Sequence, residues 1–151
     1  MPNPQSVYGQ TKYDGEESIR KCKVKHLIFR TAWVYSKSET NFIKTIIQLA
    51  KKQDKLKVVN DQIGAPTSAE LIADVTALCL YQIAQNKNSA HNLSGSYHLT
   101  PTGETSWHGF AQFIIAEALG LGIKFRTSFE NVQAIRTSEY PLPAKRPSNS
   151  L

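Results

Sequence analysis

The chain has 151 residues, of which 40% are hydrophobic and 20% charged, a composition typical of one soluble globular domain. It contains no apolar run of the roughly 20 residues that a membrane span requires, and residues 1–6 are too polar for a signal peptide. Its two cysteines, Cys22 and Cys79, are too few and too far apart for a disulfide scaffold or a zinc site. The four histidines are scattered without metal-ligand spacing. We therefore expect a cytoplasmic protein with no metal and no membrane partner.

The net charge is +6, and the basic residues concentrate in two clusters, residues 20–25 and residues 51–57. Such clusters can bind nucleic acid or a phosphorylated ligand. Neither is interleaved with aromatic residues that would stack on bases, and cations are also favourable at the C-terminal ends of helices. We interpret both clusters as solvated helix ends and expect no nucleic-acid partner.

The first predicted helix covers residues 7–21, with acidic residues toward its middle and basic residues at its end. It places Tyr8 and Lys12 four positions apart, on one face. An ammonium group beside a phenol stabilises the phenolate, which favours the phenol as a proton donor to a carbonyl oxygen. A tyrosine and a lysine at this spacing also occur by chance on surface helices, so the pair alone is not specific.

Alternating strands and helices follow this helix. The continuous apolar run of residues 26–29 predicts a strand buried on both faces, as in a parallel sheet, which continues through residues 30–35. Asn41 can cap a helix over residues 42–53, and residues 56–59 read as a further short strand. This order is typical of units in which helices connect parallel strands.

The second half of the chain begins with a polar loop, residues 60–67, whose last residue opens a segment with capping-box spacing. Thr67 is therefore either a helix cap or a residue of a ligand-binding loop. The helix that follows extends to about residue 86. Its apolar positions are expected to point inward: Leu71, Ile72, Val75, Leu78, Cys79 and Ile83.

The remaining elements are a strand over residues 97–100, a helix over residues 107–119, and a strand over residues 132–135. Trp107 lies on the apolar stripe of that helix and is expected in the core. The tail from Arg136 is rich in proline and is expected to be extended and irregular. The whole pattern predicts an α/β fold with a largely parallel sheet.

The order of motifs resembles that of the dTDP-4-dehydrorhamnose reductases, extended members of the short-chain dehydrogenase/reductase superfamily. Five stretches carry the resemblance: residues 7–12 with Gly15 and Glu16, residues 30–35, residues 59–67, residues 97–99 with 103–107, and residues 140–150. The Tyr-x-x-x-Lys pattern is common to the superfamily. The run Asp-Gln-Ile-Gly-Ala-Pro-Thr and the tail Arg-Pro-Ser-Asn-Ser are much more specific.

The resemblance implies the C-terminal portion of a Rossmann-like fold with a small substrate-binding lobe. Residues 1–60 would complete the sheet and carry the Tyr-x-x-x-Lys helix. Residues 61–151 would form most of the substrate lobe and an extended tail, the two parts making one compact unit. The sequence has no G-x-G-x-x-G fingerprint and no P-loop, so the N-terminal dinucleotide-binding half is absent from these 151 residues.

The resemblance also implies an activity, the NAD(P)H-dependent reduction of the 4-keto group of dTDP-4-dehydro-L-rhamnose to dTDP-L-rhamnose in nucleotide-sugar biosynthesis. In that reaction Tyr8 resembles the proton donor, and Lys12 resembles the residue that assists it. Both would also bind the nicotinamide ribose of NADPH or NADH. Without the Gly-rich half, we expect the chain alone to bind no dinucleotide tightly and to be inactive.

Four residues match positions that bind the dTDP-sugar in the family: Trp33, Gln62, Arg146 and Asn149. An aromatic face can pack on a pyranose or a thymine, and a guanidinium can bind a diphosphate at two points. Three of them have a structural alternative. Trp33 can close the core at a strand end. Arg146 and Asn149 can hold the tail in place by salt bridges and hydrogen bonds.

A non-catalytic role as a reductase-like nucleotide-sugar-binding or regulatory subunit is the alternative, and the intact Tyr8 and Lys12 favour the enzyme. Half of a doubly wound sheet would expose an apolar edge and face, so we expect a homodimer or other self-association. For the same reason the helix of Tyr8 and Lys12 is expected to be poorly ordered or repacked.

Overall fold

The computed structural model describes residues 3–85, 93–140, 144 and 146–150. Its elements, in chain order, are α1 (Val7–Lys21), β1 (Leu27–Arg30), β2 (Val34–Tyr35), α2 (Phe42–Lys52), β3 (Leu56–Val59), β4 (Ile63–Gly64), β5 (Thr67–Ser68), α3 (Ala69–Gln85), β6 (Gly95–His98), β7 (Thr105–Ser106), α5 (Trp107–Gly120), η1 (Phe129–Asn131), β8 (Val132–Ile135) and η2 (Thr137–Glu139). The predicted alternation of helices and strands is confirmed.

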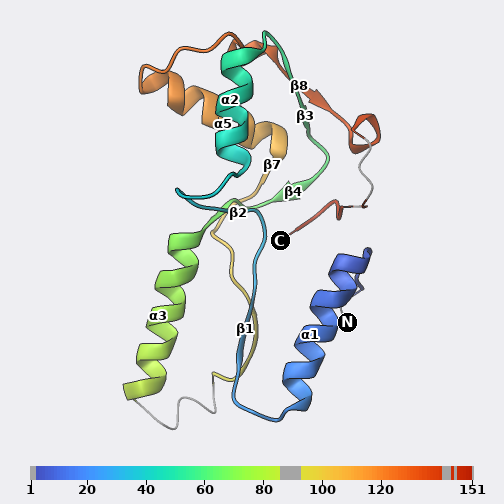
Figure 1. Ribbon diagram of the computed structural model, residues 1–151, viewed down its shortest axis with the longest axis vertical. Coiled ribbons are helices and arrows are strands. Elements are labelled where there is room, and N and C mark those ends of the chain that lie inside the picture. Colours follow the sequence, from blue (N-terminus) through green and yellow to red (C-terminus); the bar gives the residue numbers. More distant parts are fainter. Residues whose placement is uncertain (1–2, 86–92, 141–143, 145, 151) are drawn as a thin grey trace.

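These elements form two groups along the long axis of the molecule (Figure 1). The upper group contains α2, α5, β3 and β8, and the lower group contains α1, α3, β1 and β6. The short strands β2, β4 and β7 lie between them. The end of α1 where the chain enters the helix is the end nearer the upper group.

The strands pair two by two among the described residues. Three pairs are parallel, β1 with β6, β2 with β5, and β3 with β8, whereas β4 and β7 are antiparallel. Parallel pairing in an α/β fold was predicted correctly. A single continuous sheet was not, because the strands form four separate two-stranded sheets, and β2, β4, β5 and β7 are only two residues long. Every pair therefore keeps open edges in the described part of the chain.

The hydrophobic core lies in the upper group, between α2, α5, β3 and β8. Its buried members are Ile46, Ala50, Leu56, Val58, Phe110, Ala111, Ile114, Ile115 and Val132. Helices α1 and α3 contain no buried residue. The core joins elements from both sides of residue 60, so the packing crosses the boundary expected between the two parts of the chain. A division of the complete enzyme at that residue stays a prediction.

Helix caps explain where the helices begin. Asn41 Oδ1 accepts a hydrogen bond from the backbone N–H of Lys44 at 3.2 Å, as predicted for α2. The expectation that Thr67 caps α3 is wrong. Ser68 Oγ accepts from the N–H of Leu71 at 3.1 Å, while the fully buried Thr67 donates to the carbonyl of Ala65 at 3.0 Å. The hydroxyl of Ser68 therefore caps the first turn of α3, and the hydroxyl of Thr67 stabilises the preceding loop.

Two other expectations need correction. The strand expected over residues 97–100 is shifted and covers Gly95–His98, where it pairs with β1. Leu78 was expected to point inward, but 62% of its surface is exposed. No described element covers that side of α3, so its apolar pattern does not translate into burial within this chain.

Candidate functional site

The Tyr8–Lys12 pair lies in the first turns of α1, as the sequence predicts. Ser6 Oγ caps the helix by accepting from the backbone N–H of Gly9 at 3.1 Å. Lys12 Nζ lies 5.2 Å from the centre of the Tyr8 ring. The Tyr8 side chain is 72% exposed, so its phenol can meet a ligand carbonyl without displacing protein groups. The face can therefore offer both a proton donor and a cation.

Helix α1 is fixed to the strands of the lower group by charged side chains. Arg30 on β1 donates to both oxygens of Glu16, from Nε at 2.9 Å and from Nη2 at 2.6 Å. Arg20 donates to Glu16 at 2.8 Å and to Ser96 on β6 at 2.9 Å. The Arg30 hydrogen bond lowers the pKa of Glu16 from its ordinary value. The expectation of a poorly ordered helix is wrong, because α1 is helical from Val7 to Lys21. Its repacking relative to the complete enzyme stays a prediction.

A cavity of about 410 Å³, here called the Gln62 cavity, opens in the upper group. It brings together two of the predicted substrate residues, Gln62 and Arg146. Apolar side chains of α2 and β3 form much of its wall. Its full lining is Phe42, Thr45, Ile46, Leu49, Lys57, Val58, Val59, Gln62, Trp107, Tyr140 and Arg146. Two cations, one amide and an apolar wall suit a ligand with an aromatic part and an anionic part.

Gln62 is buried and oriented by neighbours outside the cavity. Its Nε2 donates to the hydroxyl of Thr137 at 3.1 Å. Thr137 donates twice to the Asp61 carboxylate. Its hydroxyl lies 2.6 Å from Oδ1, and its backbone N–H donates to the same oxygen at 2.9 Å. The Thr137 hydroxyl is the main cause that lowers the pKa of Asp61. The three residues tie η2 to the loop after β3.

The C-terminal tail runs beside β4, which brings Arg146 to the cavity. The N–H of Ile63 donates to the carbonyl of Ser148 at 2.8 Å, and Ser150 N–H donates back to the carbonyl of Ile63 at 2.9 Å. Asn149 is the bridge residue opposite Ile63 in this short parallel pairing. Arg146 therefore lines the cavity, and Asn149 holds the tail in register.

The two tryptophans stack on each other, and Trp107 also reaches the Gln62 cavity. Trp107, expected in the core, is half-buried: it packs against the core and also lines the Gln62 cavity. Trp33 is absent from the described lining of that cavity and stacks on Trp107, with ring centres 3.6 Å apart and planes inclined by 13°. The backbone of Gly64 lies against the Trp33 ring. The position of Trp107 as the first residue of α5 could have indicated that its side chain is not fully buried, because it lies at the end of the helix and not in its middle.

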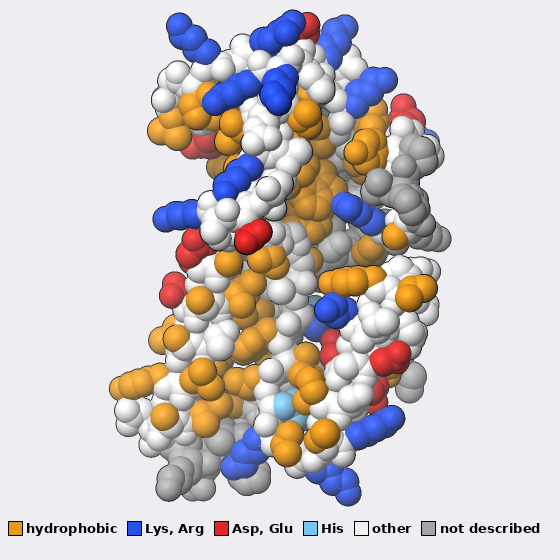
Figure 2. Space-filling model, viewed as in Figure 1, with side chains coloured by type: hydrophobic (Ala, Val, Ile, Leu, Met, Phe, Trp, Pro, Cys, Tyr) orange, Lys and Arg blue, Asp and Glu red, His pale blue; other side chains and the backbone are white. Residues whose placement is uncertain are grey.

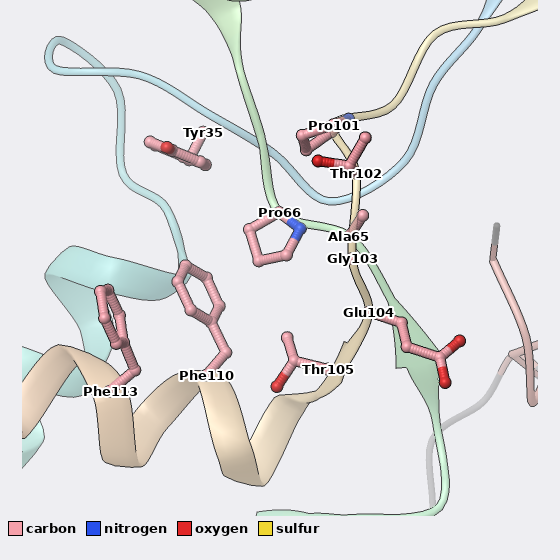
Figure 3. A pocket seen from close by; sticks show the side chains of 10 residues that line it. All are labelled: Tyr35, Ala65, Pro66, Pro101, Thr102, Gly103, Glu104, Thr105, Phe110 and Phe113. Atoms are coloured by element: carbon pink, nitrogen blue, oxygen red, sulfur yellow. The ribbon is translucent and has the colours of Figure 1, made fainter.

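A second cavity, of about 430 Å³, lies near β5 and contains no predicted site residue (Figure 3). The rings of Tyr35, Pro66, Phe110 and Phe113 gather about it. The carboxylate of Glu104 points away from those rings. This cavity offers no cation to an anionic ligand. The Gln62 cavity is therefore the better candidate for a nucleotide.

The RmlD substrate binding domain model matches residues 1–151. The chain belongs to this family. It is 46% identical over 147 residues to the dTDP-4-dehydrorhamnose reductase of Shigella flexneri and 45% identical over 147 residues to that of Escherichia coli K12. Both alignments cover 97% of this chain and 47% of the relative. The chain thus spans about half the length of these relatives.

Solved structures of dTDP-4-dehydrorhamnose reductases have a similar fold. The dTDP-4-dehydrorhamnose reductase of Clostridium acetobutylicum superposes with a TM-score of 0.79 at 40% identity. That of Bacillus anthracis, in complex with NADP, superposes with a TM-score of 0.78 at 36% identity. Each comparison covers 99% of this chain and 47% of the other chain. The predicted family and α/β fold class are confirmed.

Within residues 3–85, 93–140, 144 and 146–150, no three His, Cys, Asp or Glu side chains gather where they could hold a metal ion. Over the same residues, no helix is both long and apolar enough to cross a membrane.

Proposed function

We propose that the chain serves in the NAD(P)H-dependent reduction of the 4-keto group of dTDP-4-dehydro-L-rhamnose to dTDP-L-rhamnose. It would bind the sugar nucleotide and supply the proton in the cytoplasm. The observation that carries this proposal is the coexistence of an exposed Tyr8–Lys12 face with a cavity that contains Gln62 and Arg146. The names of the relatives, of which the chain covers 47%, support it.

The chemistry of the proton follows from the two side chains on α1. The carbonyl oxygen gains negative charge during reduction, and the Tyr8 phenol transfers its proton to that oxygen. The positive charge of Lys12 stabilises the phenolate that remains. A bound nicotinamide cofactor would supply the hydride. Tyr8 and Lys12 are exposed and polar, so they fit its ribose hydroxyls, whereas no Gly-rich fingerprint for its pyrophosphate occurs in these residues.

The substrate would be held through its nucleotide. The Arg146 guanidinium can bind the diphosphate at two points, and Lys57 adds a second positive charge to the same cavity. Gln62 would bind the base. Asn149 would act indirectly by holding the tail in place, and Trp33 would do so by supporting Trp107. In this proposal the chain alone binds the nucleotide weakly and has no turnover.

A reductase assay on a chimaera tests the proposal. The chimaera joins this chain to the half of the Shigella flexneri reductase that it does not match, and NADPH oxidation is followed with the keto-sugar nucleotide. Tyr8→Phe should lower kcat by about 10²–10⁴-fold. Tyr13→Phe, on the same helix, is the matched control and should leave kcat close to the parent's. Equal rates for the parent and Tyr8→Phe would contradict the assignment.

We further propose that the 151-residue chain self-associates. Leu78 and Tyr81 on α3 are exposed. Hydrophobic side chains cover much of the region of α3 in the space-filling view, where few Lys or Arg side chains are seen (Figure 2). Light scattering over a range of concentrations should give a mass above that of the monomer. Leu78→Lys should shift the chain toward the monomer, because it places a charge in the apolar surface. A monomer at every concentration would contradict self-association.

A further inference from the structure

The orientation of the Gln62 side-chain amide is decided by Asp61 and Thr137. The Thr137 hydroxyl lies 2.6 Å from Asp61 Oδ1. An ionised carboxylate can only accept hydrogen bonds, so the hydroxyl hydrogen of Thr137 must point at Asp61. The lowered pKa of Asp61 is consistent with an ionised carboxylate at neutral pH.

With its hydrogen committed, the Thr137 oxygen can only accept from its other neighbour, the Gln62 amide at 3.1 Å. The nitrogen of that amide must therefore face Thr137, because the flipped amide would bring two oxygen acceptors together. The carbonyl oxygen, Oε1, is consequently turned away from Thr137. Gln62 is among the residues that line the cavity, where a ligand would meet this acceptor.

We propose that Asp61 and Thr137 are positioning residues that make the Gln62 cavity selective for a planar ring with an N–H donor. Resting on the function proposed above, this inference assigns the cavity to the base of the nucleotide. The imide N3–H of thymine or uracil is such a donor, flanked by two carbonyl groups. Cytosine carries an acceptor at the same ring position and would oppose Oε1 with a second lone pair.

The rest of the cavity suits such a ring. Trp107 and Phe42 present two aromatic rings with centres 4.5 Å apart, and the apolar side chains of Ile46 and Leu49 line the same space. An aromatic face stabilises a planar base by stacking regardless of its hydrogen-bonding pattern. Affinity for any base would therefore come from these walls, and the choice of base from the orientation of Gln62.

Titration calorimetry with dTDP and with its 3-methylthymine analogue tests the inference, because the added methyl removes the N3–H donor. The parent chain should bind dTDP roughly tenfold more tightly than the analogue. Thr137→Ser keeps the hydroxyl and should keep this ratio. Thr137→Val lets the Gln62 amide turn over and should bring the ratio toward one.

Asp61→Asn is a second variant. The asparagine amide can donate to the Thr137 hydroxyl, which can then donate to the Gln62 carbonyl oxygen and so turn the Gln62 amide over. It should also bring the ratio toward one. A purely structural role of Thr137 would weaken both ligands equally and leave the ratio unchanged, which would overturn the inference. Equal binding of both ligands by the parent would overturn it too. Absence of any dTDP binding by the parent would contradict the proposed function together with the inference.

Discussion

Glu16 on α1 and Arg30 on β1 form a two-point ion pair, with Nε–Oε1 at 2.9 Å and Nη2–Oε2 at 2.6 Å. The pair matters because α1 has no buried residue that could hold it by packing. The helix that carries Tyr8 therefore depends on Glu16, which also accepts from Arg20. The position of Tyr8, the proposed proton donor, is coupled to a charge cluster around Glu16, farther along the same helix.

Removing the charge of Glu16 should destabilise the fold. Its side chain is only 15% exposed, so Glu16→Gln leaves Arg30 partly buried without its counter-ion. We expect the free energy of unfolding to fall by about 1–2 kcal/mol. The matched control is Asp54→Asn, because Asp54 also binds an arginine at two points but is 71% exposed. Urea unfolding should show a change below about 0.5 kcal/mol for that control, and equal losses in both variants would contradict the assignment.

Stability should also depend on pH through Glu16. Arg30 holds the pKa of Glu16 below its ordinary value of 4.5. As the pH falls, Glu16 is therefore protonated in the unfolded chain before it is protonated in the folded chain. The stabilisation is complete above about 4.5 and is lost as the pH falls through the lower, folded-state pKa. Urea unfolding across this range should give a smaller loss for Glu16→Gln than for the parent. If parent and variant lost stability in parallel, the Glu16–Arg30 pair would not be the cause of the pH dependence. Asp61 and Glu130, whose pKa values are also lowered, are present in both proteins.

Gly64 should be intolerant of a side chain. A Cβ there would lie 2.5 Å from Cε2 and 2.9 Å from Cδ2 of Trp33, which is itself stacked on Trp107. Gly64→Ala should lower the free energy of unfolding by about 2 kcal/mol and change the tryptophan fluorescence. Gly15→Ala is the control, because nothing lies within 4 Å of its Cβ, and alanine should stabilise α1 by about 0.5–1 kcal/mol. Unchanged stability of Gly64→Ala would show that the Trp33 ring can move away.

Local signals in the sequence were sufficient for much of the fold. The bounds of α1 and the Asn41 cap of α2 depend on neighbouring residues, and the predicted strands at 56–59 and 132–135 were found as β3 and β8. The capping of α3 was missed because adjacent hydroxyl residues, Thr67 and Ser68, share the same pattern.

The site was only half accessible from the sequence. Motif matches identified Gln62 and Arg146, which share one cavity. The role of Thr137 was not predicted, because its hydrogen bonds reach residues 75 and 76 positions away. The stacking of Trp33 on Trp107 was not predicted for the same reason, since the two residues are far apart in the sequence.

Titration calorimetry of dTDP-rhamnose into the 151-residue chain tests the central claim, that this chain carries the nucleotide-sugar site, most directly. Saturable heat at millimolar ligand is the predicted result, and Arg146→Ala should weaken binding by roughly tenfold or more, because a charge-assisted contact to the diphosphate is lost. Arg126→Ala, which removes an exposed arginine paired with Asp54, should bind as the parent does. No heat at millimolar ligand, or equal binding by Arg146→Ala and the parent, would contradict the claim.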